Sequence, residues 1–273
     1  MSVETRIGKM FAAKKASGQG CLGVFITAGD PDFDTSLEIL KGLPAAGADM
    51  IEFGMPFSDP MADGPAIQVS SQRSLANGQN MKKTLKMVRE FRAQDDETPM
   101  VLMGYYNPIY SYGVDAFLTD AKDAGVDGLI IVDLPPEEES ELCLPALKAG
   151  INFIYLTAPT TTDERLPRVL ENASGFLYYV SITGITGTKS TTAETIKPNI
   201  DRIKAASDLP IAIGFGIKTA DNVAEFNSIA DAAIVGTAVV NVIADNLDGD
   251  NRATPGLADK VLGFVSELSE GSK

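Results

Sequence analysis

The sequence has 273 residues, of which 44% are hydrophobic and 22% charged, a balance typical of a globular protein with ample material for a core. Its net charge of −14 argues against nucleic acid or an anionic membrane as a partner, because phosphate groups bind basic surfaces. The absence of histidine excludes histidine-dependent triads and histidine-ligated metal sites, and we expect no metal site.

The first segment, residues 3–17, has helical spacing, with Ile7, Met10 and Phe11 on one side and lysines on the other. Glycines at 18 and 20 end it, and we expect this helix to cover the bottom of the fold. It lacks the apolar core of a signal peptide, and no later run approaches the roughly 18 apolar residues of a membrane span. Cys21 and Cys143 lack motif spacing, so we expect free thiols in a soluble, cytoplasmic protein.

One join recurs along the chain, where a helix is expected to end and a strand to begin. Ala-Gly-Ala-Asp at 46–49 and Ala-Gly-Val-Asp at 124–127 each precede a short apolar run, and the joins at 149–152 and 230–232 have a similar form. A glycine there can take the left-handed conformation that ends a helix. The repeat predicts a helix-to-strand module that is used several times.

Eight apolar runs of strand length alternate with helical stretches. The expected strands are residues 21–27, 50–53, 100–105, 128–133, 153–156, 175–181, 210–214 and 233–236. The expected helices after the first are residues 34–46, 81–93, 114–124, 137–148, 163–172, 193–206, 219–226 and 257–268. Continuous apolar strands alternating with helices indicate a parallel sheet that is covered on its outer face. The sequence therefore predicts an α/β fold, a single (β/α)8 TIM barrel over residues 1–273 with an additional N-terminal helix.

Residues 51–65 are the most informative stretch. They begin as a buried strand that contains Glu52, a carboxylate that is costly to bury without a partner. A segment rich in proline and glycine follows, carries Asp59 and Asp63, and cannot be regular structure. A strand acid with a second carboxylate brought over it by a loop is typical of a proton-transfer site. The alternative is a glutamate that reaches water at a strand end, followed by an acidic surface loop.

Glycine-rich loops follow the last three expected strands, at 184–188, 214–217 and 236–238. In this fold the loops after strands 7 and 8 often bind phosphate at a short helix N-terminus. Glycines let backbone N–H groups approach the anion, and Thr186 and Thr237 would add hydroxyl donors. The pattern predicts a phosphate site without lysine or arginine. The alternative is that these glycines only make tight turns.

Other residues stand at the carboxyl ends of the expected strands, where barrel active sites lie. They include Phe25, Met103, Tyr105 and Tyr178. Each tyrosine could instead pack in the core with a satisfied hydroxyl. Asp133 either joins the site or caps the helix that Pro135 and Pro136 open.

The sequence Glu-Phe-Gly-Met-Pro-Phe-Ser-Asp-Pro-Met-Ala-Asp-Gly-Pro at 52–65 resembles the signature of the tryptophan synthase alpha subunit family. The resemblance spans nearly the whole chain and takes in residues 25–31, 105–108, 133–135, 184–187, 214–217 and 236–237. It implies a carbon–carbon lyase that reversibly cleaves indole-3-glycerol phosphate, by a retro-aldol reaction, to indole and glyceraldehyde 3-phosphate.

The resemblance also implies roles for individual residues. Glu52 would be the acid/base near the indole carbon that carries the glyceryl chain, Asp63 would pair with the indole N–H, and Tyr178 would order the site. Two carboxylates in unlike environments can share this chemistry, and an apolar pocket would raise the pKa of Glu52. The implied substrate-binding residues are Phe25, Met103, Tyr105, Thr186, Gly187, Phe215, Gly216, Gly236 and Thr237. The sequence departs from the family pattern at Ile182, where many relatives have a basic residue. This difference bears on how the loop after the sixth expected strand closes.

The resemblance implies a partner as well, a tryptophan synthase beta subunit in an alpha2beta2 assembly. That subunit would hold pyridoxal phosphate (PLP) and receive indole through an internal channel, so we expect no cofactor in this chain. The residues alone leave open another phosphate-binding barrel, such as a sugar-phosphate isomerase or aldolase. A non-catalytic subunit that binds a phosphate ligand and regulates a partner is also open, although the presence of both Glu52 and Asp63 favours an enzyme.

Overall fold

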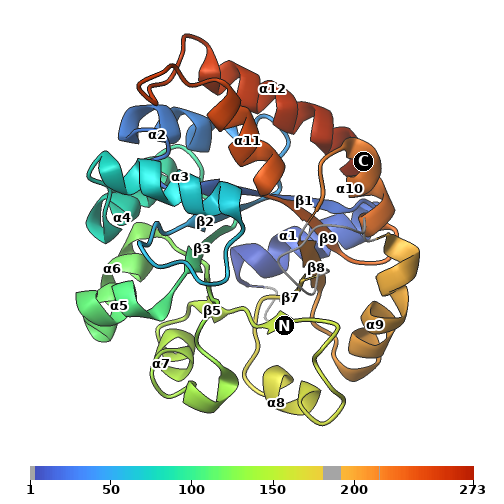
Figure 1. Cartoon of the computed structure of the whole chain (residues 1–273). Helices are drawn as coiled ribbons and strands as arrows, with labels where there is room; N and C mark the ends of the chain where they lie inside the picture. Colours follow the sequence, from blue (N-terminus) through green and yellow to red (C-terminus); the bar gives the residue numbers. More distant parts are fainter. Residues whose placement is uncertain (1–3, 181–191, 215) are drawn as a thin grey trace.

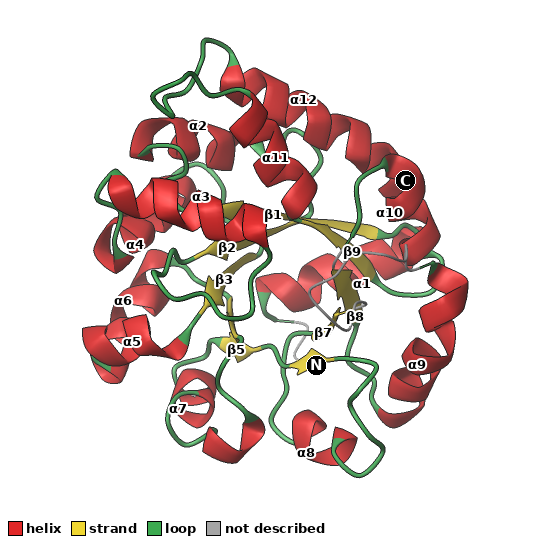
Figure 2. Cartoon of the chain, in the orientation of Figure 1, coloured by secondary structure: helices red, strands yellow, loops and turns green. Residues whose placement is uncertain are grey.

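The computed structural model describes residues 4–180, 192–214 and 216–273. Within these ranges a parallel sheet curls into a ring and helices surround it (Figures 1 and 2). The strands are β1 (Cys21–Thr27), β2 (Met50–Gly54), β3 (Met100–Gly104), β4 (Gly128–Ile131), β5 (Asn152–Phe153), β6 (Leu156–Thr157), β7 (Leu177–Val180), β8 (Ile211–Gly214) and β9 (Ala232–Val235). The α-helices are α1 (Arg6–Ser17), α2 (Phe33–Gly42), α3 (Pro65–Ala76), α4 (Met81–Arg92), α5 (Tyr106–Tyr112), α6 (Val114–Ala124), α7 (Cys143–Lys148), α8 (Leu166–Leu170), α9 (Ala193–Ala206), α10 (Ala220–Asn227), α11 (Thr237–Asp245) and α12 (Leu257–Ser269), with short 3-10 turns at Pro136–Glu138 and Glu270–Ser272.

The sheet closes on itself through one interrupted strand. Its strand order is β5-β4-β3-β2-β1-β9-β8-β7-β6, and the two edge strands are joined in the chain by Ile154 and Tyr155 alone. The N–H of Ile154 donates to Leu129 of β4 at 2.9 Å, and the carbonyl of Tyr155 accepts from Tyr178 of β7 at 3.0 Å. β5 and β6 thus act as one strand that pairs on both sides, so the ring has eight strands. This confirms the predicted (β/α)8 barrel.

Helix α1 closes the N-terminal end of the barrel, as its amphipathic spacing predicts (Figure 1). Ile7 and Phe11 are buried among side chains that fill the barrel interior, including Met50 and Val101. The Phe11 ring lies 5.8 Å from that of Phe176. Because the described residues fill this end of the barrel, we expect a ligand to enter from the carboxyl ends of the strands.

The recurring joins have a clear structural purpose. Gly125 ends α6 in the left-handed conformation, with φ 94°, as predicted. The prediction is wrong for two other joins, because α2 already ends at Gly42 and Ala149 caps α7. In three of the four joins an aspartate accepts a hydrogen bond from a backbone N–H at or near the start of the neighbouring strand. These contacts are Asp49 with Leu22 at 2.9 Å, Asp127 with Met100 at 2.8 Å and Asp231 with Ile211 at 2.9 Å. The module therefore sets the stagger between adjacent strands at these three joins.

Three helices lie where the sequence patterns predict none, namely α3, α5 and α11. The buried residues of α3 are serines, so the helix has no apolar period to detect. α5 contains Pro108, a residue that usually indicates a break, but it sits in the first turn, where its missing N–H is tolerated. α11 is rich in valine and isoleucine and continues directly from the last strand.

Two predicted helices begin later than expected, and proline explains both. The helix predicted at 137–148 is a 3-10 turn followed by α7, and the helix predicted at 163–172 is reduced to α8. Pro145 and Pro167 lie in the first turns of these helices. A proline further into a helix would remove a backbone hydrogen bond, so each helix begins just before its proline.

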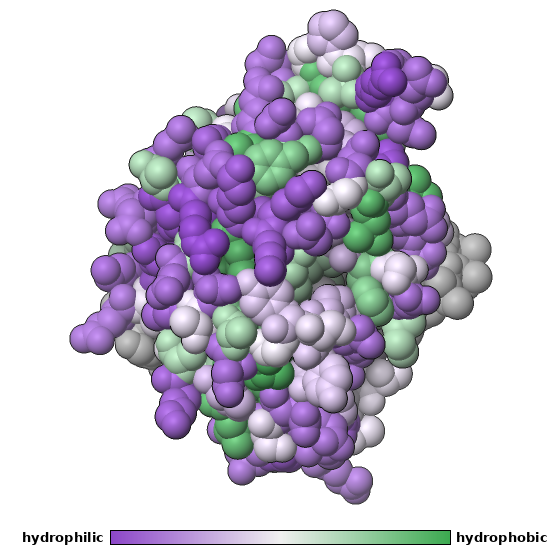
Figure 3. Space-filling model, turned by 90° about the vertical axis from the view of Figure 1, so that its left-hand side faces the viewer, coloured by the Kyte–Doolittle hydropathy of each residue, from purple (hydrophilic) through white to green (hydrophobic). Residues whose placement is uncertain are grey.

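The side of the molecule that carries the helices at the left of Figure 1 is mainly hydrophilic, with small scattered apolar patches (Figure 3). None of the helices in the described part of the chain is long and apolar enough to cross a bilayer.

Candidate active site

A cavity of about 240 Å³ opens at the carboxyl ends of the strands. Its walls are mostly apolar, and its polar side chains come from four places: strands β2 and β7, the loop before α3 and the start of α11. The lining residues are Phe25, Glu52, Ala62, Asp63, Gly64, Ile67, Met103, Val132, Leu156, Tyr178, Val180, Gly216, Ile217, Ile234, Gly236 and Thr237. A mostly apolar pocket with a few convergent polar groups is the usual form of a small-molecule site.

Glu52 is the deepest acid in the cavity. In the sheet register it lies between Phe25 of β1 and Val101 of β3, and Val101 belongs to the barrel interior. Glu52 is only 2% exposed, and its Oε1 has no hydrogen-bond partner among the described residues. Burial, and secondarily the nearby charge of Asp63, raise the pKa of Glu52 to about 8. A buried carboxyl that stays protonated near neutral pH, with a free oxygen facing a cavity, can donate a proton to a ligand.

Asp63 reaches the cavity from the loop between β2 and α3. Burial raises its pKa to about 6, and a hydrogen bond with the Tyr105 hydroxyl opposes that rise. The same hydroxyl accepts the backbone N–H of Ala62 at 2.9 Å. The Phe57 ring, earlier in this loop, lies 5.4 Å from the Tyr105 ring. Tyr105 therefore fastens the loop to the end of β3, with Asp63 over the cavity.

Tyr178 stands beside Glu52 on the inner face of β7. Burial, and then the charge of Glu52, raise the pKa of its hydroxyl well above the usual value, so it stays neutral. The hydroxyl occupies the space beside Gly214 of β8, where a Cβ atom would lie 1.8 Å away. Only glycine at 214 leaves room for this tyrosine in its observed position.

Another part of the cavity wall presents backbone groups. Gly236 is the N-cap of α11 and Thr237 its first residue, and no side chain caps this helix end. Gly216 has φ +81°, a conformation that favours glycine. A helix start without a side-chain cap offers N–H groups and positive potential to an anion, so this wall suits a phosphate group.

Comparison with known proteins identifies the family of this chain. The family model described as tryptophan synthase alpha chain matches residues 11–268. The chain belongs to the tryptophan synthase alpha chain family. A tryptophan synthase subunit alpha from Legionella pneumophila str. Paris is 39% identical, with a TM-score of 0.88 and 98% of each chain covered.

Two further solved structures are similar to this chain over nearly its whole length. A protein from Aquifex aeolicus VF5 is 34% identical, with a TM-score of 0.88, over 98% of this chain and 99% of that one. A tryptophan synthase from M. tuberculosis in its aminoacrylate-bound form is 30% identical, with a TM-score of 0.86, over 98% of this chain and 100% of that one.

The structure brings together most of the residues that the sequence singles out. Those lining the cavity are Phe25, Glu52, Asp63, Met103, Tyr178, Gly216, Gly236 and Thr237. Tyr105 lies beside the cavity, against Asp63, and borders a smaller adjoining recess. Its contact with an indole ring stays a prediction. Thr186, Gly187, Phe215 and the departure at Ile182 lie outside the described residues.

Asp133, for which two roles are open from sequence, caps a different helix from the one expected. Its carboxylate accepts the backbone N–H of Tyr106, at the start of α5, at 2.8 Å. The cap therefore belongs to the helix after β3 rather than to the turn that follows Asp133 itself.

Sequence reasoning missed the apolar residues of the cavity wall. They are Ile67, Val132, Leu156, Val180, Ile217 and Ile234. Most stand at or just beyond strand ends, which is the available signal. However, an apolar residue there has the same appearance in sequence whether it faces the cavity or the helix layer. In the described part of the chain no group of three or more acidic, cysteine or histidine side chains could hold a metal ion.

Proposed function

We propose that this chain reversibly cleaves indole-3-glycerol phosphate to indole and glyceraldehyde 3-phosphate. The observation that carries the proposal is Glu52, a buried carboxyl with a free oxygen in an apolar cavity. A second carboxyl, Asp63, shares the cavity, and the uncapped start of α11 forms another part of its wall. Family membership supports the same reaction.

The two carboxyl groups suit the two halves of this reaction. Protonated Glu52 donates its proton to the ring carbon that carries the glyceryl chain, and positive charge develops at the ring nitrogen. Ionised Asp63 accepts a hydrogen bond from the ring N–H and stabilises that charge. The Glu52 carboxylate then takes the proton of the adjacent glyceryl hydroxyl as the carbon–carbon bond breaks. The bonding electrons return to the ring, an aldehyde forms, and Glu52 is again protonated.

The rest of the cavity matches the two ends of this substrate. Apolar side chains such as Met103, Val132 and Leu156 suit a flat aromatic ring. Gly216, Gly236 and Thr237 suit the phosphate, because backbone N–H groups bind it without a basic side chain. Thr186, Gly187 and Phe215 are proposed to contribute on the strength of the family resemblance alone.

The proposed mechanism predicts a bell-shaped dependence of kcat/KM on pH. Activity needs Asp63 ionised, which holds above its pKa of about 6, and Glu52 protonated, which holds below its pKa of about 8. We therefore expect an acid limb near the first value and a basic limb near the second, as properties of the interacting pair. Initial rates of indole formation from about pH 5 to about pH 10 measure this. A rate that keeps rising above about pH 9 would contradict Glu52 as the proton donor.

The direct test is indole release from indole-3-glycerol phosphate by the purified chain. We expect indole and glyceraldehyde 3-phosphate in equal amounts, and no turnover of ribulose phosphate or ketose phosphates under the same conditions. Turnover of those sugars instead would point to a different phosphate-binding barrel enzyme. Calorimetric binding of the substrate without any turnover, even with a partner present, would point to a regulatory subunit.

We further propose that the chain works in the cytoplasm with a tryptophan synthase beta subunit in an alpha2beta2 assembly. In this arrangement PLP belongs to the partner, which receives the indole. Support comes from family membership and from the match to the tryptophan synthase of M. tuberculosis. Adding a beta subunit to the assay is expected to raise the rate of indole-3-glycerol phosphate cleavage. Equal rates and no co-elution would indicate a stand-alone lyase.

A further inference from the structure

Helix α3 is attached to the barrel in an unusual way. It begins two residues after Asp63, with Gly64 as its N-cap and Pro65 as its first residue. Its buried residues are Ser70, Ser71 and Ser74. By contrast, the next helix, α4, buries leucine, methionine, valine and phenylalanine in the usual apolar stripe. Directional polar contacts, rather than apolar packing, therefore fix the position of α3.

The strongest of these contacts is an ion pair between Arg73 of α3 and Asp30, in the loop after β1. Arg73 Nε donates to Asp30 Oδ1 and Nη2 donates to Oδ2, both at 2.8 Å. The two side chains are 9% and 0% exposed. This paired geometry allows one orientation of the guanidinium relative to the carboxylate, so it fixes direction as well as distance.

Three neutral hydrogen bonds extend the same attachment along the helix. All of them run from α3, or its C-cap, to the end of β1 or the loop that follows. They join the hydroxyls of Ser70 and Thr27 at 2.6 Å, Ser74 Oγ to the carbonyl of Ala28 at 2.6 Å, and Asn77 Nδ2 to the carbonyl of Pro31 at 2.6 Å. Together with the ion pair they hold α3 on the β1 loop over about two helical turns.

Fixing the position of α3 also restricts Asp63, because the short segment between Asp63 and the first turn of α3 has little freedom to move. Pro65 restricts the first turn, and Gln68 Nε2 of that turn donates to the carbonyl of Asp63 at 2.8 Å. The residues that α3 contacts lie at the end of β1 and in the loop after it. β1 in turn pairs with β2, so that Phe25 lies opposite Glu52. The same strand therefore locates Glu52 through the sheet and Asp63 through α3.

We propose that Asp30 and Arg73 are positioning residues for the reaction, which hold Asp63 at its working place relative to Glu52. The inference rests on the proposed function, since it assigns Asp63 a role in turnover. An error of about 1 Å in the placement of a catalytic group can reduce the rate about a hundredfold. A shift of α3 on the β1 loop would displace Asp63. Helix α11 also contacts α3, but it is held separately by β1 and α12, so we expect the phosphate wall to move less than Asp63.

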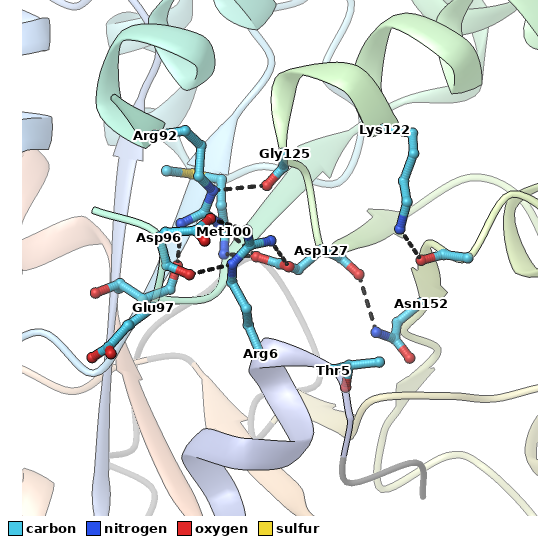
Figure 4. Close-up of polar contacts among 12 residues, drawn as sticks. Thr5, Arg6, Arg92, Asp96, Glu97, Met100, Lys122, Gly125, Asp127 and Asn152 are labelled. Carbon is cyan, nitrogen blue, oxygen red and sulfur yellow. Dashed lines mark hydrogen bonds and ion pairs between the residues drawn. The ribbon is translucent and has the colours of Figure 1, made fainter. Parts of the chain in front are cut away.

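Arg73→Lys tests the proposal, because lysine keeps the charge and loses the paired geometry. The chain offers a matched control in Arg92→Lys. Arg92 also pairs with a buried aspartate, Asp127, at 2.6 Å, with side chains 9% and 7% exposed, but at the opposite end of the barrel (Figure 4). We expect Arg73→Lys to lower kcat for indole formation about tenfold or more, with KM changed less than about threefold. We expect Arg92→Lys to change neither constant more than about twofold, with both rates referred to folded protein measured by circular dichroism.

Asp63→Asn in the same assay distinguishes a failure of the positioning role of Asp30 and Arg73 from a failure of the proposed function. If Asp63→Asn is inactive while Arg73→Lys keeps its kcat, the positioning role is wrong and the proposed function stands. If Arg73→Lys and Arg92→Lys lose kcat equally, the effect is general destabilisation and the positioning role is again wrong. If Asp63→Asn keeps full activity, the proposed role of Asp63 fails first. Should Arg73→Lys not fold, Ser74→Ala removes a single contact of the same attachment and is expected to lower kcat in the same direction.

Discussion

Glu52→Gln is expected to lower kcat for indole formation by about 10²- to 10⁴-fold, the range typical for loss of a general acid–base group. Glutamine is close in size to glutamic acid but cannot donate a proton to the ring carbon or take one from the glyceryl hydroxyl. The cavity that surrounds residue 52 should keep its shape, so we expect KM to change little. A loss of less than about tenfold, which corresponds to about 1.4 kcal/mol of transition-state stabilisation, would show that the acid–base assignment is wrong.

The stability of this variant provides the control. Folding raises the pKa of Glu52 from its usual 4.5 to about 8, so between these values the folded state holds a proton that the unfolded state has released. The side chain therefore lowers the free energy of unfolding as the pH rises through this window. Glutamine removes that penalty, and Glu52→Gln is expected to melt at or above the wild-type temperature near pH 8. Inactivity accompanied by a lower melting temperature would indicate damage to the fold instead.

The sequence located Glu52 well because two simple patterns agree there. An apolar run of strand length places residue 52 in the sheet, and the repeated helix-to-strand units place the end of that strand at the mouth of a barrel. The feature on which its proposed reactivity rests is not visible in these patterns. Its free oxygen depends on which side chains meet it inside the barrel, and these come from strands far apart in the sequence.

The positioning of Asp63 shows where sequence patterns stop being informative. The buried residues of α3 are serines, so this helix has no apolar periodicity. The apolar pattern that predicts α4 therefore does not predict α3. The partners Arg73 and Asp30 are 43 residues apart, and no local rule pairs them. Tyr105 appeared from sequence to be one more residue at a strand end. Only the folded chain places its hydroxyl between Ala62 and Asp63, where it holds the loop.

The closed end of the barrel carries a second buried network, which the sequence also leaves unspecified. Asp127 accepts hydrogen bonds from Arg6 of α1 at 3.0 Å, from Arg92 of α4 at 2.6 Å and from the backbone N–H of Met100 of β3 at 2.8 Å (Figure 4). Arg6 also pairs with Asp96. One carboxylate thus joins the N-terminal helix, an outer helix and a strand of the barrel.

Asp127→Asn is expected to lower the free energy of unfolding by about 3–5 kcal/mol, because it leaves two partly buried guanidinium groups without their shared counter-charge. In a chain of this size that corresponds to a fall in melting temperature of roughly 10 °C, measured by calorimetry or circular dichroism. Faster hydrogen exchange in α1 should accompany it, since Arg6 loses a buried partner.

Asp201→Asn is the matched control, because the Lys197–Asp201 pair is also 2.6 Å long but both side chains are 54% exposed. Its loss should cost about 0.5 kcal/mol or less. If the two variants had the same melting temperature, the buried network would contribute no more than a surface ion pair, and α1 would be held mainly by its other contacts, among them buried Ile7 and Phe11 and the Lys14–Asp49 ion pair.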